Sequence, residues 1–261
     1  MYPNEIIWGI DLYVIMLCVA AISAMIVYRI LADKLCLSAE LQNLCLFGAV
    51  AAIFAGYGAA VLFQAIYNIP KNNGFMLNAS TGATFYGGLI GGATVFLALY
   101  FLVGNFLFKE SREHIKCFWS NAGIGAACIA VAHGFGRIGC LMAGCCHGKA
   151  TDAWYGVYMK SIGQKVVPIQ AFEAIVLFAL FAVFFFRILK GKRYNLSLYM
   201  MMYGIWRFFI EYARDDYRGY TFVSFLTPSQ LTAVIMILGA VAVFVAEKQI
   251  SKRNDAYYDK D

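Results

Sequence analysis

Apolar residues are arranged along this sequence in long runs that short polar connections separate. Five runs are close to the roughly 20 residues that an α-helix needs to cross a hydrocarbon core about 30 Å thick, and two later runs are shorter. A short helix can still span where the bilayer thins or flanking side chains reach the interface. The pattern predicts an all-α integral membrane protein with seven transmembrane helices, at residues 12–31, 44–67, 84–103, 117–136, 170–189, 196–212 and 231–246.

Composition supports a membrane location and excludes an ordinary soluble protein. Hydrophobic residues make up 62% of the 261 residues and charged residues 14%, whereas soluble domains have roughly 45–50% and about 25%. A soluble helical protein would also show a polar face on its helices, and residues 12–29 show almost none. We expect no second domain, so that residues 1–261 form a single polytopic membrane domain.

Lysine and arginine are distributed unevenly between alternate connections. Thirteen of the 21 lie in connections assigned to one side, and eight lie in the longer connections of the other side. Because cytoplasmic loops carry an excess of these residues, we predict an N-terminus outside and a cytoplasmic C-terminus. A long outer loop at about residues 137–167, of the kind that often carries function, and a short cytoplasmic tail from about residue 248 complete this topology.

Polar residues gather at the predicted outer ends of the helices. Ionisable groups at membrane depth cost about 2.5 to 3.5 kcal/mol each at the centre and less near the interface, so they normally face a cavity and mark a substrate path. The alternative is interfacial snorkelling with ion pairing at helix ends. The residues at this level are Asp11, Gln64, Tyr86, His133, Arg137, Gln170, Glu173, Arg207 and Glu211.

The sixth predicted helix has a polar face. Polar residues recur along it at spacings of four, four, three and four: Tyr203, Arg207, Glu211, Arg214 and Arg218. Such a face must meet protein or water, because lipid offers no hydrogen-bond partners. Arginine binds phosphate through two parallel hydrogen bonds and keeps its charge when partly desolvated. We therefore predict that Arg137 and Arg207 hold an anionic lipid headgroup; the alternative is an Arg207–Glu211 pair that merely neutralises itself.

Four motifs, in order along the chain, resemble those of the prolipoprotein diacylglyceryl transferases, which move diacylglycerol from phosphatidylglycerol to a lipobox cysteine. GRIGCLMAGCCHG at 136–148 is similar to the family signature GRIGNFxNGExxG. GGLIG at 87–91 resembles HGGLIG, and PIQAFE at 168–173 resembles PSQLYE. YGIWRF at 203–208, with Glu211 and Arg214, resembles YGxxRFxxExxR, and TPSQ at 227–230 is a looser match.

The resemblance implies a transferase of the bacterial plasma (inner) membrane. Its partners would be phosphatidylglycerol, a prolipoprotein signal peptide with its lipobox cysteine, and the surrounding membrane lipids, with no nucleic acid, cofactor or metal. Gly87 and Gly91 form a GxxxG pattern that admits a helix or an acyl chain close to the backbone. The predicted catalytic residues are Arg137, Arg207, His133 and Tyr86. The predicted substrate-binding residues are Arg137, Arg207, Tyr203, Glu211, Gly87, Gly88, Gly139, Gly144, Gln170 and Glu173.

The sequence departs from the family pattern at four positions. Tyr86 stands at the family's histidine, Cys140 and Ala143 stand at its two asparagines, and Cys145 stands at its glutamate. The arginines are kept while their polar surroundings change. The departures therefore leave open the acceptor and the group that takes its proton.

Two histidines are candidates for this base. In the reaction that the family implies, a thiolate attacks a glycerol carbon and glycerol phosphate leaves, so the thiol must first lose its proton. His133 lies four residues before Arg137, on the same face if the helix continues, and His147 lies in the outer loop. A buried structural role for His133 is the alternative.

Three cysteines cluster in the outer loop, at Cys140, Cys145 and Cys146. Their spacings of five and one lack the CxxC knuckle of tetrahedral zinc sites, so the sequence does not favour a metal. A disulfide from Cys140 to Cys145 or Cys146 is expected in an oxidising compartment, and free thiols elsewhere. A covalent lipid intermediate on one cysteine rests on position alone.

Two other functions remain open. The first is a related phospholipid-dependent transfer to a different acceptor, such as a glycan, another lipid or a small thiol. The second is non-catalytic lipid binding or transport, although the sequence shows no internal repeat and no proline-broken paired helices.

Overall fold

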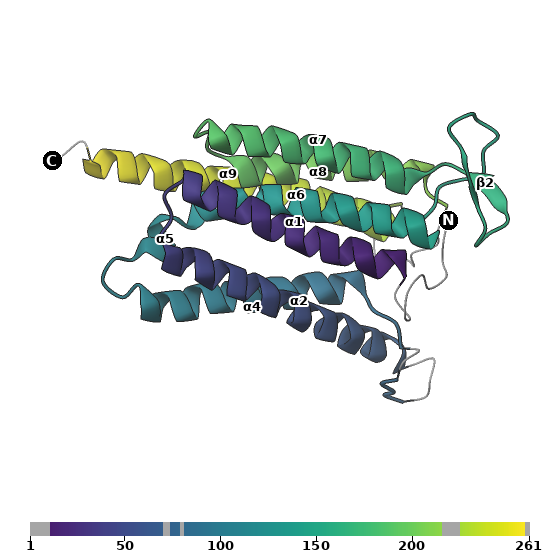
Figure 1. Cartoon of the computed structure of the whole chain (residues 1–261), viewed down its shortest axis with the longest axis horizontal. Helices are drawn as coiled ribbons and strands as arrows, with labels where there is room; N and C mark the ends of the chain where they lie inside the picture. Colours follow the sequence, from purple (N-terminus) through teal and green to yellow (C-terminus); the bar gives the residue numbers. More distant parts are fainter. Residues whose placement is uncertain (1–10, 70–73, 79–80, 216–224, 259–261) are drawn as a thin grey trace. The chain divides into compact units, whose positions relative to one another are not determined.

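The computed structural model describes residues 11–69, 74–78, 81–215 and 225–258 (Figure 1). Helices dominate these ranges, and a two-stranded hairpin is the only sheet within them. The elements are α1 Leu12–Lys34, α2 Ala39–Tyr67, α4 Phe85–Leu107, α5 Glu113–Lys116, α6 Phe118–Ala143, β1 Val157–Met159, β2 Gln164–Val166, α7 Ile169–Leu189, α8 Asn195–Ile210, η1 Glu211–Ala213 and α9 Pro228–Tyr258. Six helices, α1, α2, α4, α6, α7 and α9, are long and apolar enough to cross a membrane, which confirms the all-α membrane class.

The last two predicted spans differ from the others in length. The 16 residues of α8 give about 24 Å at 1.5 Å per residue, less than a hydrocarbon core about 30 Å thick. By contrast, α9 continues to Tyr258, well beyond the predicted end at residue 246. The polar tail expected from about residue 248 is therefore helical in its described part.

The connection that the sequence predicts to be a long outer loop begins later in the structure. α6 runs through Ala143, so residues 137–143 are helical and the connection starts at Gly144. The helix continues because apolar side chains recur at helical spacing up to Met142. It ends where Gly144 adopts a φ of +72°, a conformation that glycine reaches without a Cβ penalty.

The chain divides into two compact units, which are described separately. The first contains Met1–Leu35 and Trp119–Asp261, with α1, α6, α7, α8, η1, α9 and the hairpin. The second contains Cys36–Phe118, with α2, α4 and α5.

Small residues bring the helices of the first unit close together. A Cβ atom on Gly134 of α6 would lie 2.9 Å from the Phe178 ring of α7. A Cβ atom on Gly204 of α8 would lie 2.8 Å from the Ile237 side chain of α9. A larger residue at either position would displace these side chains, so both glycines let the helices pack closely.

The hairpin lies at one end of this unit, beyond the end of α6 and the start of α7 (Figure 1). β1 and β2 pair antiparallel, and Gly163 turns the chain between them with a φ of +67°. Isolated bridges join Ala150 to Val166 and Gly148 to Arg214. This connection is therefore tied by backbone hydrogen bonds to the end of η1 and to the residue that follows it.

In the second unit, α4 packs on α2 through glycines. A Cβ atom on Gly56 would lie 3.0 Å from the carbonyl oxygen of Gly88, so the two backbones almost touch. The Tyr100 hydroxyl donates a hydrogen bond of 2.6 Å to the carbonyl of His114, which secures the short helix α5.

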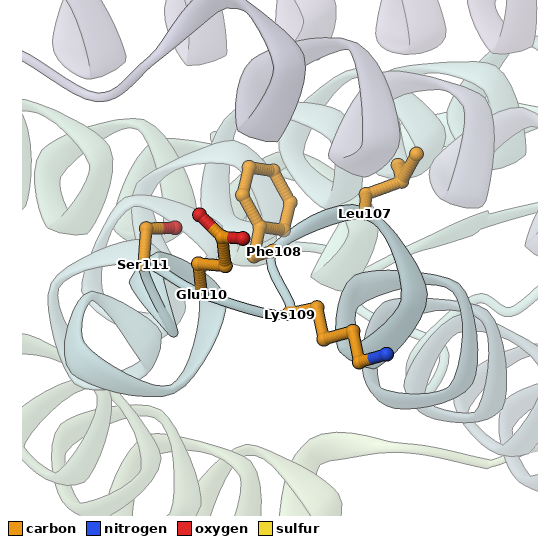
Figure 2. Close-up of a pocket in the computed structure, with 5 residues that line it drawn as sticks. All are labelled: Leu107, Phe108, Lys109, Glu110 and Ser111. Carbon is orange, nitrogen blue, oxygen red and sulfur yellow. The ribbon is translucent and has the colours of Figure 1, made fainter.

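A hollow of about 380 Å³ lies at the turn after α4 (Figure 2). It is lined by five consecutive residues: Leu107, Phe108, Lys109, Glu110 and Ser111. None of the predicted site residues lines this hollow, so it gives no support to the predicted site.

Candidate active site

A buried carboxylate, Glu173, joins three of the predicted site residues. It lies in the first turns of α7 with none of its side chain exposed, and its Oε2 is 3.0 Å from Nε of Arg137 on α6. Its Oε1 accepts a hydrogen bond of 2.7 Å from the Tyr203 hydroxyl on α8. An unpaired buried carboxylate would be costly, so these contacts fix all three side chains. One carboxylate thus connects α6, α7 and α8.

His133 lies beside this group, one turn before Arg137 on α6. Its ring is half-buried, with its centroid 5.3 Å from that of Tyr203 and the planes at 71°. The charges of Arg137, Glu173 and Arg207 all act on it. The structure therefore brings this predicted base together with both predicted arginines.

A second ion pair lies one turn further along α8. Arg207 Nη2 is 2.8 Å from Glu211 Oε2 and also donates a 2.8 Å hydrogen bond to Ser229 Oγ. The Thr227 hydroxyl donates to Glu211 Oε1 at 3.0 Å, and Arg214 Nε lies 3.7 Å from Glu211 Oε2. Of the predicted polar face, Arg207 therefore lies on α8, Glu211 on η1 and Arg214 just after it, and their contacts reach the start of α9.

One nitrogen of Arg207 remains without a hydrogen-bond partner among the described residues. It is Nη1, which is buried, while Arg137 keeps 14% of its side chain exposed. A buried donor without an acceptor is costly, and a phosphate oxygen suits a guanidinium. The arrangement can therefore accept an anionic group. Arg218, the last member of the predicted face, lies outside the described residues.

Three other predicted substrate-binding residues shape the end of α6. Gln170 is almost fully buried and its Nε2 donates to the carbonyl of Cys145. A Cβ atom on Gly139 would lie 3.0 Å from the Tyr13 ring of α1, so this glycine packs two helices together. Gly144 provides the turn that ends α6. Direct contact of these residues with a substrate stays a prediction.

The turn after α6 is a Schellman cap. Gly144 N–H donates to the carbonyl of Leu141 at 3.2 Å, and Cys145 N–H donates to that of Cys140 at 3.1 Å. Ala143, which replaces one of the family's asparagines, is the last residue of the helix. The cap places two of the other altered positions, Cys140 and Cys145, next to each other.

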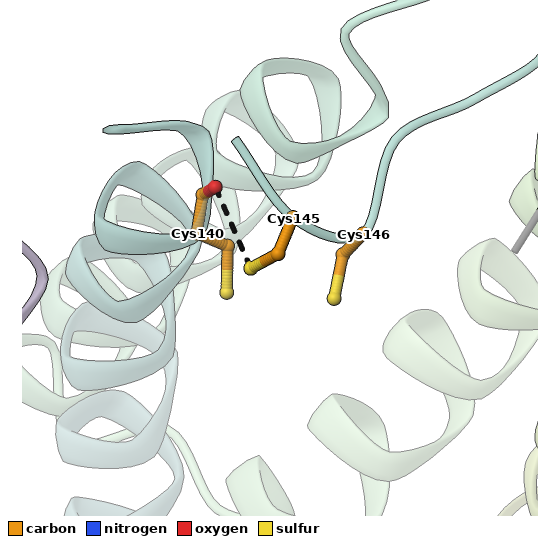
Figure 3. A group of neighbouring side chains, drawn as sticks. All are labelled: Cys140, Cys145 and Cys146. Carbon is orange, nitrogen blue, oxygen red and sulfur yellow. Dashed lines mark hydrogen bonds between the residues drawn. The ribbon is translucent and has the colours of Figure 1, made fainter. Parts of the chain in front are cut away.

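The three clustered cysteines share one small space at this turn. The sulfur atoms of Cys140, Cys145 and Cys146 all lie within 4.8 Å of one another, and their side chains point to the same side (Figure 3). None of the three forms a disulfide with another described cysteine. Hydrogen bonding with Cys140, then with Cys146, and then burial raise the pKa of Cys145 above its ordinary value.

Three predicted residues belong to the second unit. Tyr86 lies in the first turn of α4 and is partly exposed. A Cβ atom on Gly87 would lie 2.7 Å from Cβ of Phe63, and one on Gly88 would lie 3.4 Å from Cβ of Ala60, both on α2. The glycines therefore pack α4 against α2, and their contact with a substrate stays a prediction.

Two hydroxyl groups of the cluster were not assigned a role from the sequence. Ser229 and Thr227 belong to a motif that matched the family only loosely, yet they bind Arg207 and Glu211. The sequence indicated them only through the polar motif TPSQ at 227–230, at the start of the last helix. Its partners could not be found from spacing, because they lie 22 and 16 residues away.

Three known proteins that are similar to this chain are all named as diacylglyceryl transferases. A family model described as prolipoprotein diacylglyceryl transferase matches residues 5–246. Phosphatidylglycerol-prolipoprotein diacylglyceryl transferase 2 of Clostridium perfringens is 34% identical over 174 residues, covering 64% of this chain and 63% of that protein. The enzyme of that name from Clostridium tetani is 30% identical over 209 residues, covering 77% and 78%. That from Clostridioides difficile is 29% identical over 214 residues, covering 79% and 78%.

Proposed function

The chain belongs to the prolipoprotein diacylglyceryl transferase family, and we propose that it transfers the diacylglyceryl group of phosphatidylglycerol to the lipobox cysteine of a prolipoprotein. The reaction takes place at the outer face of a bacterial plasma membrane. The end of α6, the start of α7 and the residues after η1 all meet at the hairpin, so the candidate site lies at one end of the first unit. In a seven-span topology with the N-terminus outside, this is the outer end.

The short helix α8 is the sixth span of this topology, in addition to the six longer apolar helices. Its polar face contacts Glu173 of α7 and Ser229 of α9 and so is not left to lipid. A helix of about 24 Å crosses where the bilayer thins or where neighbouring helices shelter it.

The observation that carries this function is the convergence of two arginines from separate helices. Arg137 pairs with Glu173, and Arg207 follows one turn after the tyrosine that binds the same carboxylate. The charges of both arginines act on Glu173. If the ion pairs served only to neutralise one another, there would be no reason for the buried Nη1 of Arg207 to lack a partner within the described residues. A phosphodiester oxygen supplies that partner.

The proposed reaction uses these arginines to stabilise the leaving group. A sulfur–carbon bond forms at the glycerol carbon that bears the phosphate, and the bond from this carbon to oxygen breaks. The electron pair leaves with glycerol phosphate, and the thiol proton goes to a base. Donors held in place for a developing negative charge act without reorganisation, which is usually the largest single contribution to catalysis.

Of the two candidate bases, His147 is the one that lies in the turn with the clustered cysteines. Its Nδ1 lies 3.1 Å from the carbonyl oxygen of Gly148. Because a carbonyl only accepts, Nδ1 carries the hydrogen, and in the neutral ring the lone pair is then on Nε2. The ring is half-buried and follows Cys146 directly in the chain. Gln replacements of His147 and His133 separate the two, since only loss of the base should remove the acidic limb of the pH–rate profile.

A second candidate function is transfer of the same group to a different acceptor. It is favoured by Cys140, Ala143 and Cys145, which replace the polar side chains of the family signature at the end of α6. The lipid donor is the same in both functions, so the two differ only in the molecule that accepts the diacylglyceryl group.

The test uses purified protein in vesicles that contain phosphatidylglycerol labelled in its acyl chains. A synthetic lipobox peptide should gain the mass of a diacylglyceryl group while glycerol phosphate is released, and a Cys→Ser peptide should gain none. Consumption of the lipid without modification of the peptide would favour another acceptor. Binding of the lipid without its consumption would favour a non-catalytic protein and refute the transferase.

A further inference from the structure

The thiols at the end of α6 have the spacing of a metal site. The sulfur atoms of Cys140, Cys145 and Cys146 lie within 4.8 Å of one another. Zinc–sulfur bonds of about 2.3 Å in a tetrahedral site place sulfur atoms about 3.8 Å apart. The widest pair therefore needs to close by no more than about 1 Å, which small rotations of the cysteine side chains provide.

The backbone brings these residues together without a CxxC knuckle. In the Schellman cap, Cys145 N–H binds the carbonyl of Cys140, and Cys145 Sγ lies 3.7 Å from the same oxygen (Figure 3). Cys146 adopts a φ of +60°, which few non-glycine residues do. The cap thus performs the local reversal that two intervening residues perform in a zinc knuckle.

Neighbouring groups hold the turn in position. The Ser161 hydroxyl donates to the carbonyl of Gly144 at 2.8 Å, and Gln170 donates to that of Cys145. Gly148 N–H donates to the carbonyl of Val167 at 3.0 Å. Groups that orient ligands in this way raise metal affinity, because less ordering is left for the binding step.

The exposure and chemistry of the cluster indicate the class of metal. Cys145 is exposed and the other two thiols are half-buried, so the set can be reached from outside. Thiolates select soft or borderline ions, and sites with three protein ligands and an open fourth position are typical of catalytic zinc. Cys140 and Cys146 also lie within electrostatic reach of Arg137.

We propose that Cys140, Cys145 and Cys146 bind a soft divalent metal ion such as zinc, and that the fourth position takes the thiolate of the acceptor. Metal binding by the three cysteines is independent of the proposed function, whereas the binding of the acceptor thiolate to the metal rests on it. Metal binding releases the thiol protons to solvent. The bound acceptor sulfur forms its bond to the glycerol carbon as the bond from this carbon to the phosphate oxygen breaks. Glycerol phosphate leaves with the electron pair and with the phosphate that Arg137 holds. The resulting thioether, a weaker ligand, leaves the metal.

The first test titrates the purified, reduced protein with cadmium and follows the ultraviolet absorption of cadmium–thiolate bonds. One equivalent should bind, and C140S, C145S and C146S should each weaken binding at least about 100-fold, since even outer partners of metal ligands change affinity 10- to 100-fold. C18S, at an exposed cysteine in α1, should bind like the unaltered protein. Absence of the absorption, or unchanged affinity in the three variants, would overturn the site.

A second measurement needs no variant and so does not depend on variant folding. Cadmium should protect the three cysteines from maleimide labelling, mapped by mass spectrometry, while the exposed Cys36 stays reactive. Equal labelling with and without cadmium would also overturn the proposal, as would a disulfide among the three that persists in reductant.

The role of the fourth position is tested with cobalt-loaded protein. A lipobox peptide should alter the visible cobalt spectrum, and its Cys→Ser counterpart should not; identical spectra would overturn this part. Metal binding without diacylglyceryl transfer would refute the proposed function and leave the site standing. Full transfer by a protein that binds no metal would refute the inference and leave the function standing.

Discussion

Replacement of Arg207 by lysine separates the shape of the guanidinium from its charge. Arg207 contacts Glu211 and Ser229, both at 2.8 Å, and its Nη1 has no partner within the described residues. A lysine ammonium is a single point charge on a flexible stem. It can remain near Glu211, but it cannot also bind Ser229 and a phosphate with the geometry of a planar fork.

The expected loss follows from these contacts. Removing one donor to a developing oxyanion typically costs about 10²- to 10³-fold in kcat, or about 2.7 to 4 kcal/mol. We expect about 10²-fold for Arg207→Lys. Arg207→Ala should lower kcat by about 10³-fold. It should also lower the free energy of unfolding by about 3 kcal/mol, because the ion pair that Glu211 then keeps among the described residues is the more distant one with Arg214, at 3.7 Å.

The assay measures the rate of thioether formation on a lipobox peptide in phosphatidylglycerol vesicles. Ser229→Ala removes only the hydroxyl that orients Arg207, and a hydrogen bond to a charged group is worth about 1.5 to 3 kcal/mol, so a loss of at least about tenfold is expected. Arg187→Lys is the matched control, since Arg187 lies in the last turn of α7 and binds Asn195. Full turnover of Arg207→Lys, with a melting temperature equal to that of the control, would refute a role of this guanidinium in binding phosphate.

Three further predictions concern stability, measured by thermal unfolding in detergent. Glu173→Gln leaves Arg137 without its buried counter-charge and should lower the free energy of unfolding by about 3 kcal/mol; a loss below about 1 kcal/mol would contradict the ion pair. Burial, and then Arg112, lower the pKa of His114, so below about pH 6.5 the unfolded chain takes up a proton that the folded protein does not. The melting temperature should therefore fall from pH 6.5 toward pH 5, and His114→Gln should flatten this slope, whereas an unchanged slope would exclude the histidine. Gly144→Ala forces a Cβ atom into a φ of +72° and should cost about 1 to 2 kcal/mol, and no loss would mean that the turn relaxes.

The helices could be predicted because a single property, a long apolar run, determines them. The run at 170–189 became α7, Ile169–Leu189, almost without change. The helix ends were less predictable, because an end depends on local backbone bonds. α6 passes the predicted end at residue 136 and stops only where Gly144 forms its cap.

The candidate site could be predicted in part. Helical spacing was sufficient to place Arg207 beside Glu211, because α8 continues directly into η1, where Glu211 lies. Spacing could not join Arg137 to Glu173 or Glu173 to Tyr203, because these pairs depend on how three helices pack. The fit of Gly134 against the Phe178 ring brings α6 and α7 together, and that is a property of shape rather than of pattern.

The cysteine turn shows a different limit. The absence of a CxxC spacing argued against a metal, but that rule describes one way of folding a chain back on itself. The cap after α6 is another way, and it brings thiols five residues apart within reach of one ion.

The retained and the altered parts of the family signature differ in how they are built. Arg137 pairs with Glu173 of α7, which in turn binds Tyr203 of α8, so the proposed lipid-binding half is fixed by side chains from distant parts of the chain. The proposed acceptor half is assembled locally, from Cys140 to Cys146, on one helix end and its cap. A change in a distributed network must be compensated on several helices at once, whereas a change within one turn need not disturb the rest. Under the proposed function, the contacts to the headgroup can therefore be kept while the proposed acceptor side, which contains Cys140 and Cys145, changes its chemistry.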